Sequence, residues 1–229
     1  MNLEWVKVPA GGPVKYDYWI MKYPVTNEVY CEWLNALPNV EAAKHYCPLM
    51  AVHFFGGIEV SGEGASRRYQ SKTDFSKKPV VFVSYDDAEA FAMVVGGRIP
   101  TAVEWNKAAA WLPAENRFAG YCTGFDAPPS QDPEDSNSAN FYDSEKGWAL
   151  PIPHLADVDL YPVCGSYRLC GMAGNVAEWV DATMPNGWKC TFGGSLFRPV
   201  GQTLLHSMEG DRRDKRLSTF GFRVVKTDA

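Results

Sequence analysis

The sequence predicts an α+β fold with few short helices, short antiparallel strands and long irregular loops. The prediction rests on capped amphipathic stretches in the first half of the chain, on brief strand-like runs elsewhere, and on frequent glycine and proline. The chain of 229 residues contains 20 Gly and 16 Pro, which end helices and open turns. Because helices and strands do not alternate regularly, a doubly wound parallel sheet is disfavoured.

The first helix is predicted to begin after Thr26 and to end before Pro38. Thr26 is a good N-cap residue, and Glu28 in the first turn favours the helix dipole. Pro38 cannot continue a helix. Between these residues, apolar side chains recur at the helical spacing i, i+3, i+4 and i+7, at Tyr30, Trp33, Leu34 and Leu37.

Two capping boxes predict the remaining helices. Ser84 with Asp87 opens the second helix, and Thr101 with Glu104 opens the third, which is expected to run to Pro113. The apolar stripe of the second helix consists of Ala88, Phe91, Ala92 and Val95. The buried face of the third helix consists of Trp105, Ala108, Ala109 and Leu112.

The rest of the chain is predicted to form short strands and loops. The runs typical of strands are residues 6–8, 18–21, 80–83 and 221–225. Residues 62–78 and 126–137 are polar or rich in proline, and we expect exposed loops there. Residues 1–229 are expected to form a single domain.

Charge and hydropathy exclude several classes of protein. The formal net charge is −5, whereas a dedicated nucleic-acid-binding domain is usually basic, so no nucleic-acid partner is expected. No apolar run reaches the length that crosses a membrane, so no membrane insertion is expected. The first residues lack the regions of a signal peptide, which favours a cytoplasmic location at synthesis and leaves virion or cell-surface display by a non-Sec route open. The oligomeric state is not predicted.

The cysteines are predicted to be reduced. No CxxC spacing occurs among them, and scattered thiols in a chain without an export signal are typical of a cytosolic protein. A disulfide framework would require an export route. The six residues are Cys31, Cys47, Cys122, Cys164, Cys170 and Cys190.

Six segments, in order along the chain, resemble the formylglycine-generating enzyme (sulfatase-modifying factor) family. Residues 98–105 resemble its Arg-Leu-Pro-Thr-x-x-Glu-Trp box, and residues 171–179 resemble its Met-x-Gly-Asn-Val-x-Glu-Trp box. The other segments are residues 23–27, 79–88, 193–195 and 221–223. The resemblance spans nearly the whole chain, and it implies the variant of the C-type lectin fold that this family has.

The resemblance also implies a structural Ca²⁺ ion, with Asn175 and Glu178 as side-chain ligands. Two oxygen-bearing side chains with backbone carbonyls between them suit a hard cation. The alternative is that both side chains only form hydrogen bonds within the loop. A second calcium site of the family would use Asn140 and an acid near Asp157 or Asp159, in a loop whose length departs from the family pattern.

The catalytic residues of the family are absent from the matching positions. In the enzyme branch, two cysteines just after the Gly-Gly-Ser box bind copper, since thiolates select Cu(I). Here residues 196–202 contain no thiol, and Cys190 lies before the box. The four histidines lack the His-x-x-x-His-x-Glu spacing of the iron-dependent sulfoxide synthases, and no hydrolase or nucleotide-binding motif occurs. We therefore expect no copper and no enzymatic activity.

The expected function is ligand binding by a C-terminal surface, residues 195–220. A non-enzymatic branch of the fold, the variable proteins of diversity-generating retroelements, diversifies residues just before the terminal Gly-Phe-Arg and binds ligands there. The framework boxes kept here resemble that plan, and the expected partner is a protein or another macromolecule. The candidate contact residues are Leu196, Phe197, Arg198, Val200, Gln202, His206, Met208 and Arg212.

Two other functions remain open from the sequence. One is a divergent formylglycine-generating-type copper oxidase of protein cysteine, acting with Cys190 or with an unrecognised metal set. The other is an inactive paralogue that modulates such an enzyme. A copper titration with a cysteine-containing peptide separates the oxidase from a protein that only binds.

Overall fold

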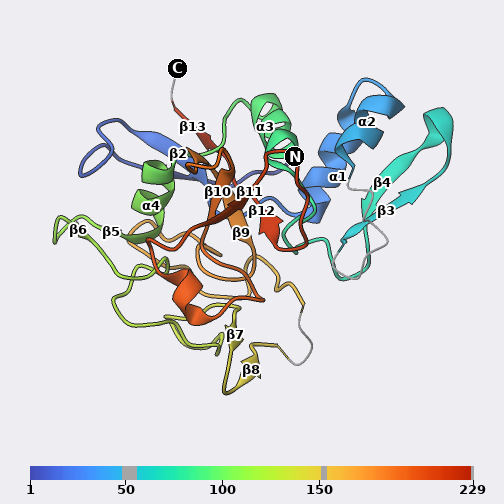
Figure 1. Cartoon of the computed structure of the whole chain (residues 1–229). Helices are drawn as coiled ribbons and strands as arrows, with labels where there is room; N and C mark the ends of the chain where they lie inside the picture. The colour runs from blue at the N-terminus through green and yellow to red at the C-terminus, as the bar shows by residue number, and fades with distance from the viewer. Residues whose placement is uncertain (48–55, 151–153, 228–229) are drawn as a thin grey trace.

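A computed structural model describes residues 1–47, 56–150 and 154–227, and it confirms the α+β class (Figure 1). Short helices surround a small central sheet, and long loops fill one end of the molecule. Within the described ranges the α-helices are α1 (Asn27–Ala36), α2 (Val40–Tyr46), α3 (Tyr85–Val94) and α4 (Ala102–Ala110), with 3₁₀ turns η2 (Gly64–Ser66) and η3 (Val200–Thr203).

Two sheets form the centre. The first has the strand order β1-β2-β13 and consists of β1 (Trp5–Val8), β2 (Tyr18–Met21) and β13 (Val225–Lys226). The second has the order β11-β10-β9-β12 and consists of β9 (Ala177–Thr183), β10 (Lys189–Phe192), β11 (Glu209–Asp211) and β12 (Phe220–Gly221). Neighbouring strands are antiparallel except β12, which lies parallel to β9.

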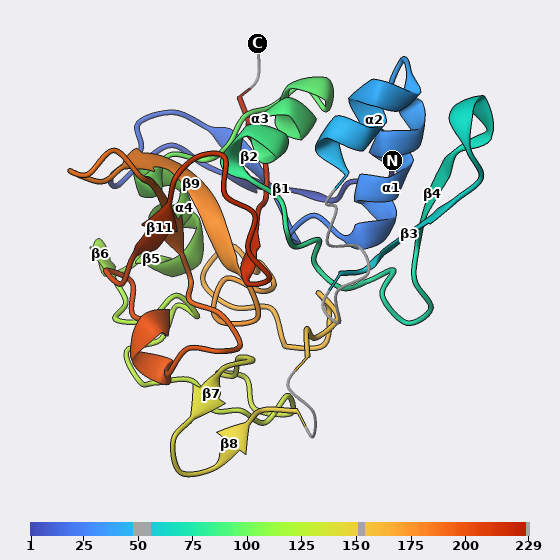
Figure 2. The same ribbon diagram turned by 45° about the vertical axis from the view of Figure 1, so that its right-hand side comes forward.

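Three two-stranded hairpins lie outside these sheets. They are β3 (Ile58–Ser61) with β4 (Arg68–Ser71), β5 (Trp111–Leu112) with β6 (Arg117–Phe118), and β7 (Tyr142–Asp143) with β8 (Gly147–Trp148). Figures 1 and 2 show α1, α2 and the β3–β4 hairpin together on one side of the central sheet. The β7–β8 hairpin lies at the lower end, close to η3.

The predicted helix starts are confirmed. The Thr26 side chain accepts a hydrogen bond from the backbone N–H of Val29 at 3.4 Å. Ser84 and Asp87 form a reciprocal capping box, with contacts of 2.8 and 3.1 Å. The Thr101 box also forms, and it draws the carboxylate of its partner, Glu104, into a contact with Arg98 at 2.6 Å.

The third helix ends earlier than predicted. It stops at Ala110, and Trp111–Leu112 form β5 instead. Leu112 precedes Pro113, and a residue before proline is pushed out of the helical region. The Trp111 ring packs edge-on against Phe118 of β6, at 5.0 Å between centroids. α2 was not predicted, because only Ala43 of this short helix is buried and its sequence shows no apolar stripe.

Residues 80–83 are not a strand, so this prediction is wrong. The segment is buried, but its backbone pairs with two different loops, through Val80 N–H to Val25 O and Phe82 N–H to Leu217 O, both at 2.9 Å. Phe82 has φ +58°, which breaks strand geometry.

Two further segments differ from the sequence prediction. Residues 62–78 are not simply an exposed loop, because they contain β4 with the buried side chain of Tyr69. Residues 221–225 do not form one strand: their ends belong to β12 and β13, which lie in different sheets.

Large aromatic side chains organise the core. Trp33, Trp105 and Trp179 are almost fully buried. Trp33 lies in the cluster between α1 and α3, while Trp105 lies in the cluster between α4 and the central strands. Each fully buried apolar side chain contributes on the order of 1.5–3 kcal/mol to folding.

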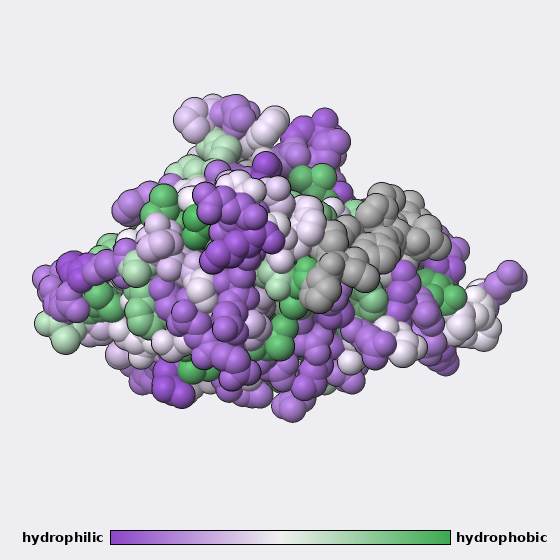
Figure 3. All heavy atoms as spheres, turned by 90° about the horizontal axis from the view of Figure 1, so that it is seen from below, coloured by the Kyte–Doolittle hydropathy of each residue, from purple (hydrophilic) through white to green (hydrophobic). Residues whose placement is uncertain are grey.

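The surface is mixed in character. On the face drawn in Figure 3, apolar atoms form small groups among polar ones. No helix among the described residues is long and apolar enough to cross a membrane.

Candidate functional site

A groove of about 400 Å³ lies beside the segment that the sequence predicts to present a ligand. Its volume falls within the range of small-molecule sites. We call it the Trp188 groove. It is lined by Met184, Asn186, Trp188, Arg198, Glu209, Gly210, Asp211, Leu217, Thr219 and Phe220.

One wall of the groove is the turn between β9 and β10. Met184 N–H donates to Trp188 O at 2.8 Å, and the Asn186 side chain accepts from Trp188 N–H at 3.1 Å. Gly187 has φ +85°, a backbone conformation that glycine adopts without strain. The turn therefore holds the indole of Trp188, 40% exposed, at the edge of the groove.

The opposite wall is β11, which pairs with β10. A side chain at Gly210 would collide with the backbone oxygen of Lys189, so glycine permits the close approach of the two strands. Glu209 and Asp211 are two residues apart and therefore point to the same face of the strand. Both line the groove, and they give this wall two carboxylates.

Arg198 supplies the positive charge of the groove. Its Nε lies 2.6 Å from Oε1 of Glu209, with side-chain exposures of 54% and 19%. Its backbone is fixed on both sides: Arg198 N–H donates to Ser195 O at 2.9 Å, and Arg198 O accepts from Tyr142 N–H at 3.0 Å. An ion pair with one exposed partner contributes little to stability, so the Arg198 guanidinium is available to exchange partners with a ligand.

The Gly-Gly-Ser box turns the chain from β10 towards Arg198. Gly193 and Gly194 have φ +92° and +70°. A Cβ at Gly193 would lie 2.8 Å from Met172 O, and one at Gly194 would lie 2.8 Å from Gln202 O. Both positions therefore require glycine, for backbone conformation and for space.

Polar contacts of α3 support the base of the β9–β10 hairpin. The Lys189 ammonium donates to Asp181 Oδ1 at 2.7 Å and lies 4.5 Å from the centre of the Tyr85 ring. The hydrogen bond from Lys189 lowers the pKa of the Asp181 carboxyl. Because Tyr85 OH also donates to Asp181, at 3.1 Å, the hairpin base is held against α3.

Of the predicted contact residues, Arg198 alone is among the residues lining this groove. Leu196 is only 1% exposed and packs in a core cluster with Val81 and Leu155, so the prediction that it contacts ligand is wrong. The chain leaves the Gly-Gly-Ser turn with this side chain pointing inward, and the sequence has no strand period here that predicts the direction.

The other predicted contact residues lie outside the groove. Phe197 is half-buried, with its ring 5.4 Å from that of Trp148. Val200 is half-buried against the core, and Gln202 accepts a hydrogen bond from Ser207 Oγ at 2.6 Å. The exposed members of the set are His206, Met208 and Arg212.

The sequence analysis missed Trp188, Glu209 and Asp211. A signal for Trp188 was present, because Asn186-Gly187 is a strong two-residue hairpin sequence. It predicts a turn at this point, and Trp188 follows the turn directly in the sequence. Glu209 and Asp211 gave no such signal, since short acidic edge strands resemble loops.

Glu178 does not fit the predicted calcium site. Its carboxylate is 1% exposed and receives two hydrogen bonds from Arg223, both at 2.7 Å, and one from Trp105 Nε1 at 2.8 Å. A divalent cation at this carboxylate would face the buried guanidinium at close range. The arrangement is a buried ion pair between β9 and the terminal Gly-Phe-Arg box.

Asn175 does not fit the predicted calcium site either. Its Oδ1 accepts from Ala156 N–H at 2.9 Å and from Asn140 Nδ2 at 3.1 Å, and its Nδ2 donates to Ala156 O at 3.1 Å. Both side chains therefore form hydrogen bonds, as in the alternative given by the sequence, but their partners lie in other segments and not within the loop. Among the described residues, no group of three or more His, Cys, Asp or Glu side chains is arranged to hold a metal ion.

The six cysteines are buried, and none of them forms a disulfide with another. Burial raises the pKa of Cys190, which precedes the Gly-Gly-Ser box in the sequence, and that of every other cysteine. A raised pKa keeps a thiol protonated, which disfavours both nucleophilic attack and copper binding. The reduced state predicted from the sequence agrees with this packing.

Two other hollows are somewhat larger than the Trp188 groove. One, of about 510 Å³, lies between the α1–α2 corner and the β3–β4 hairpin, and the other, of about 490 Å³, lies beside β1 and α1. Volume alone therefore does not decide which of the three hollows is the functional site. The Trp188 groove adjoins the Gly-Gly-Ser box and combines an exposed indole with charges of both signs, which the other two do not.

Comparison with known proteins identifies relatives among enzymes. Residues 8–228 match the sulfatase-modifying factor enzyme 1-like domain. A hercynine oxygenase of Mycolicibacterium smegmatis is 48% identical over 176 residues, covering 72% of this chain and 37% of the relative. The serine/threonine-protein kinase pkn1 of Chlamydia pneumoniae is 25% identical over 173 residues, covering 76% and 24%. The chain thus spans well under half the length of these relatives.

Solved structures share the fold over the full length. CarF superposes with a TM-score of 0.66 at 22% identity, covering 100% of this chain and 99% of the other. Treponema denticola variable protein 1 superposes with a TM-score of 0.56 at 16% identity, covering 99% and 92%. At these identities the likeness concerns the fold alone, which is the fold expected from the sequence.

The expectation that the chain is not an enzyme is wrong. It rested on the missing cysteine pair, but relatives that are 38% to 48% identical are named as oxygenases. Loss of those thiols therefore does not separate this chain from the enzymes of the family. The family itself is shown by a match over almost all of the sequence. The chain belongs to the sulfatase-modifying factor enzyme 1-like (formylglycine-generating enzyme) family.

Proposed function

We propose that this chain is the substrate-binding domain of an oxygenase-type enzyme and that the Trp188 groove holds a small zwitterion, an amino acid or its N-methylated betaine. The observation that supports it is the placement of an exposed indole, two carboxylates and one guanidinium around one groove of about 400 Å³. The hercynine oxygenases among the relatives act, by their name, on such a betaine.

The cation of the ligand would lie between Trp188 and the acidic wall. An aromatic face attracts a quaternary ammonium through its quadrupole, with an energy of about 0.5–2 kcal/mol depending on solvent exposure. Glu209 and Asp211 add negative charge on the opposite side of the groove. A quaternary ammonium cannot donate hydrogen bonds, so this combination of an aromatic ring and nearby negative charge suits it.

The carboxylate of the ligand would bind Arg198. The guanidinium already pairs with Glu209 at the surface. A zwitterion inserted between the two side chains gives each a new partner of the right sign. The exchange replaces one ion pair with two and adds the aromatic contact, which favours a zwitterion over a simple cation or anion.

Calorimetric titration of hercynine tests the proposal. We expect binding to the wild type and a loss of about tenfold in affinity with Trp188→Ala, because a change of 1.4 kcal/mol is tenfold. Met93→Ala is a matched control, since Met93 is 71% exposed on α3 and lines none of the hollows described above. Equal affinity of the wild type and Trp188→Ala would contradict the site.

A second candidate function, binding of a protein or another macromolecule, is favoured by one observation. Met208, 53% exposed, precedes the acidic wall of the groove, and the exposed His206 and Arg212 lie on the same segment. A partner that covers this rim would lose affinity with Met208→Ala and Arg212→Ala. A zwitterion confined to the groove would bind both variants as well as the wild type.

A further inference from the structure

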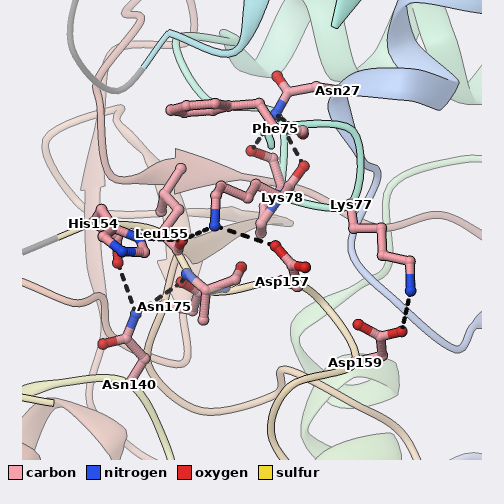
Figure 4. A network of polar contacts seen from close by, with 12 residues as sticks. Asn27, Phe75, Lys77, Lys78, Asn140, His154, Leu155, Asp157, Asp159 and Asn175 are labelled. Atoms are coloured by element: carbon pink, nitrogen blue, oxygen red, sulfur yellow. Dashed lines mark hydrogen bonds and ion pairs between the residues drawn. The ribbon is translucent and has the colours of Figure 1, made fainter. Parts of the chain in front are cut away.

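Residues 154–159 lie against the Asn175 turn without forming a helix or strand. Side chains from three other segments hold them in place, as Figure 4 shows. Segments held in this way need partners for their backbone oxygens, and calcium-binding loops obtain them from a metal ion.

The ammonium of Lys78 provides this partner. Its Nζ donates to Leu155 O at 2.8 Å and to Asp157 Oδ1 at 3.1 Å (Figure 4). The side chain is 11% exposed, and the ring of Phe75 lies 5.8 Å from the ammonium. A backbone carbonyl and a carboxylate are the ligands that a hard cation prefers, and here they face a positive nitrogen.

The backbone that carries this lysine is fixed by hydrogen bonds of its own. Asn27 Nδ2 donates to Lys78 O at 3.0 Å and to Phe75 O at 3.1 Å. Val158 N–H donates to Lys77 O at 3.0 Å, so the lysine segment and the loop are also joined through their backbones. The position of the charge is therefore set by the fold.

Two asparagines complete the network from the other side. The Asn175 amide pairs with both backbone groups of Ala156, and Asn140 Nδ2 donates to His154 O at 3.2 Å. Asn175 O then accepts from Leu196 N–H at 3.0 Å. The same network therefore supports the chain where it leaves the Gly-Gly-Ser box towards the Trp188 groove.

We infer that the Lys78 ammonium is a built-in structural cation that replaces a divalent ion at the 154–159 loop. The resemblance places a second calcium site at Asn140 and an acid near Asp157 or Asp159, and here Asn140 and Asp157 both contact this network rather than an open set of oxygen ligands. A divalent ion at Leu155 O and Asp157 would have to displace the ammonium. The loop is consequently independent of calcium.

Thermal unfolding with calcium or a chelator tests this inference. The wild type should have the same Tm in 2 mM CaCl2 as in excess EDTA. Lys78→Met keeps the apolar stem and removes the charge, and we expect its Tm in EDTA to fall by about 4–8 °C, the effect of leaving the buried carbonyl of Leu155 and the partly exposed carboxylate of Asp157 without their donor. Lys77→Met is the matched control: that lysine pairs with Asp159 on the same loop at 2.9 Å but is 61% exposed.

The outcomes separate clearly. A calcium-insensitive wild type, a destabilised Lys78→Met and a near-normal Lys77→Met support the built-in cation, and restoration of the Tm by Lys78→Arg adds to that support. A wild type that EDTA destabilises by more than about 2 °C would overturn it. A Lys78→Met protein as stable as the wild type would overturn it as well. If Lys78→Met does not fold, the calcium response of the wild type and the Tm of Lys78→Arg still decide.

Discussion

Replacing Glu178 by Gln removes one charge from the most deeply buried ion pair that the structure shows. The side chains of Glu178 and Arg223 are 1% and 0% exposed, and two hydrogen bonds of 2.7 Å join them. Removing one partner leaves a buried guanidinium without its counter-charge, which costs about 3–5 kcal/mol. For a chain of this length the Tm should fall by roughly 6–20 °C.

A surface pair of the same geometry is the control. Arg212 contacts Asp214 through Nε at 3.0 Å and Nη2 at 2.7 Å, but both side chains are 58% exposed. Asp214→Asn should therefore cost at most about 1 kcal/mol in urea unfolding. Equal stability of Glu178→Gln and the wild type would refute the ion-pair account. So would a wild-type protein that a chelator destabilises as much as Glu178→Gln, because that result would make Glu178 a metal ligand.

Two further predictions concern backbone space and thiols. Gly174→Ala should lower the free energy of unfolding by about 2–4 kcal/mol, since φ is +66° and the new Cβ would collide with Asn140 O. Gly187→Ala, also at positive φ but with nothing within 4 Å, should cost about 1 kcal/mol, and equal losses in urea titrations would contradict this. Burial raises the pKa of Cys31 to about 12 and that of Cys47 to about 11. The unfolded chain therefore loses these protons first, so the free energy of unfolding should be unaffected below about pH 8.5 and should fall between there and pH 11. Replacing both cysteines with serine should reduce that fall. A pH profile that is the same with and without the two thiols would contradict the prediction.

The helix starts were predictable because they depend on local chemistry. Thr26, Ser84 and Thr101 each cap a helix through contacts within three residues of themselves. The end of the third helix was less predictable. Pro113 excludes Leu112 by a local rule, but the exit already at Ala110 accompanies the packing of Trp111 against Phe118, which the sequence of the helix does not indicate.

The direction of single side chains in the C-terminal segment was not predictable. Leu196 and Arg198 are two residues apart, yet one is buried in the core and the other is exposed in the groove. The tight turn at Gly193-Gly194 and the hydrogen bond from Leu196 N–H to Asn175 O set these directions. The hydrogen bond joins residues far apart in the sequence, and the turn depends on the close approach of Gly193 to Met172 O. The periodicity of the segment therefore does not predict these directions.

The partners that the predicted calcium ligands have in the fold were not predictable for a related reason. Asn175 and Glu178 have the residue types and spacing of oxygen ligands, and the sequence shows what a side chain offers. It does not show that Arg223, which lies 45 positions from Glu178, already occupies the carboxylate. A distant cationic side chain can replace a metal ion without leaving a trace in the local motif.

The most direct test of the Trp188 groove follows its indole N–H during a titration with hercynine in a two-dimensional ¹H–¹⁵N NMR spectrum. The Trp188→Phe spectrum assigns the resonance among the 8 tryptophans of the chain. The account predicts that the Trp188 signal moves progressively and saturates, while the signals of the buried Trp33 and Trp105 stay in place. A Trp188 signal that does not move at saturating ligand, or ligand-dependent shifts confined to other tryptophans, would contradict the proposed site.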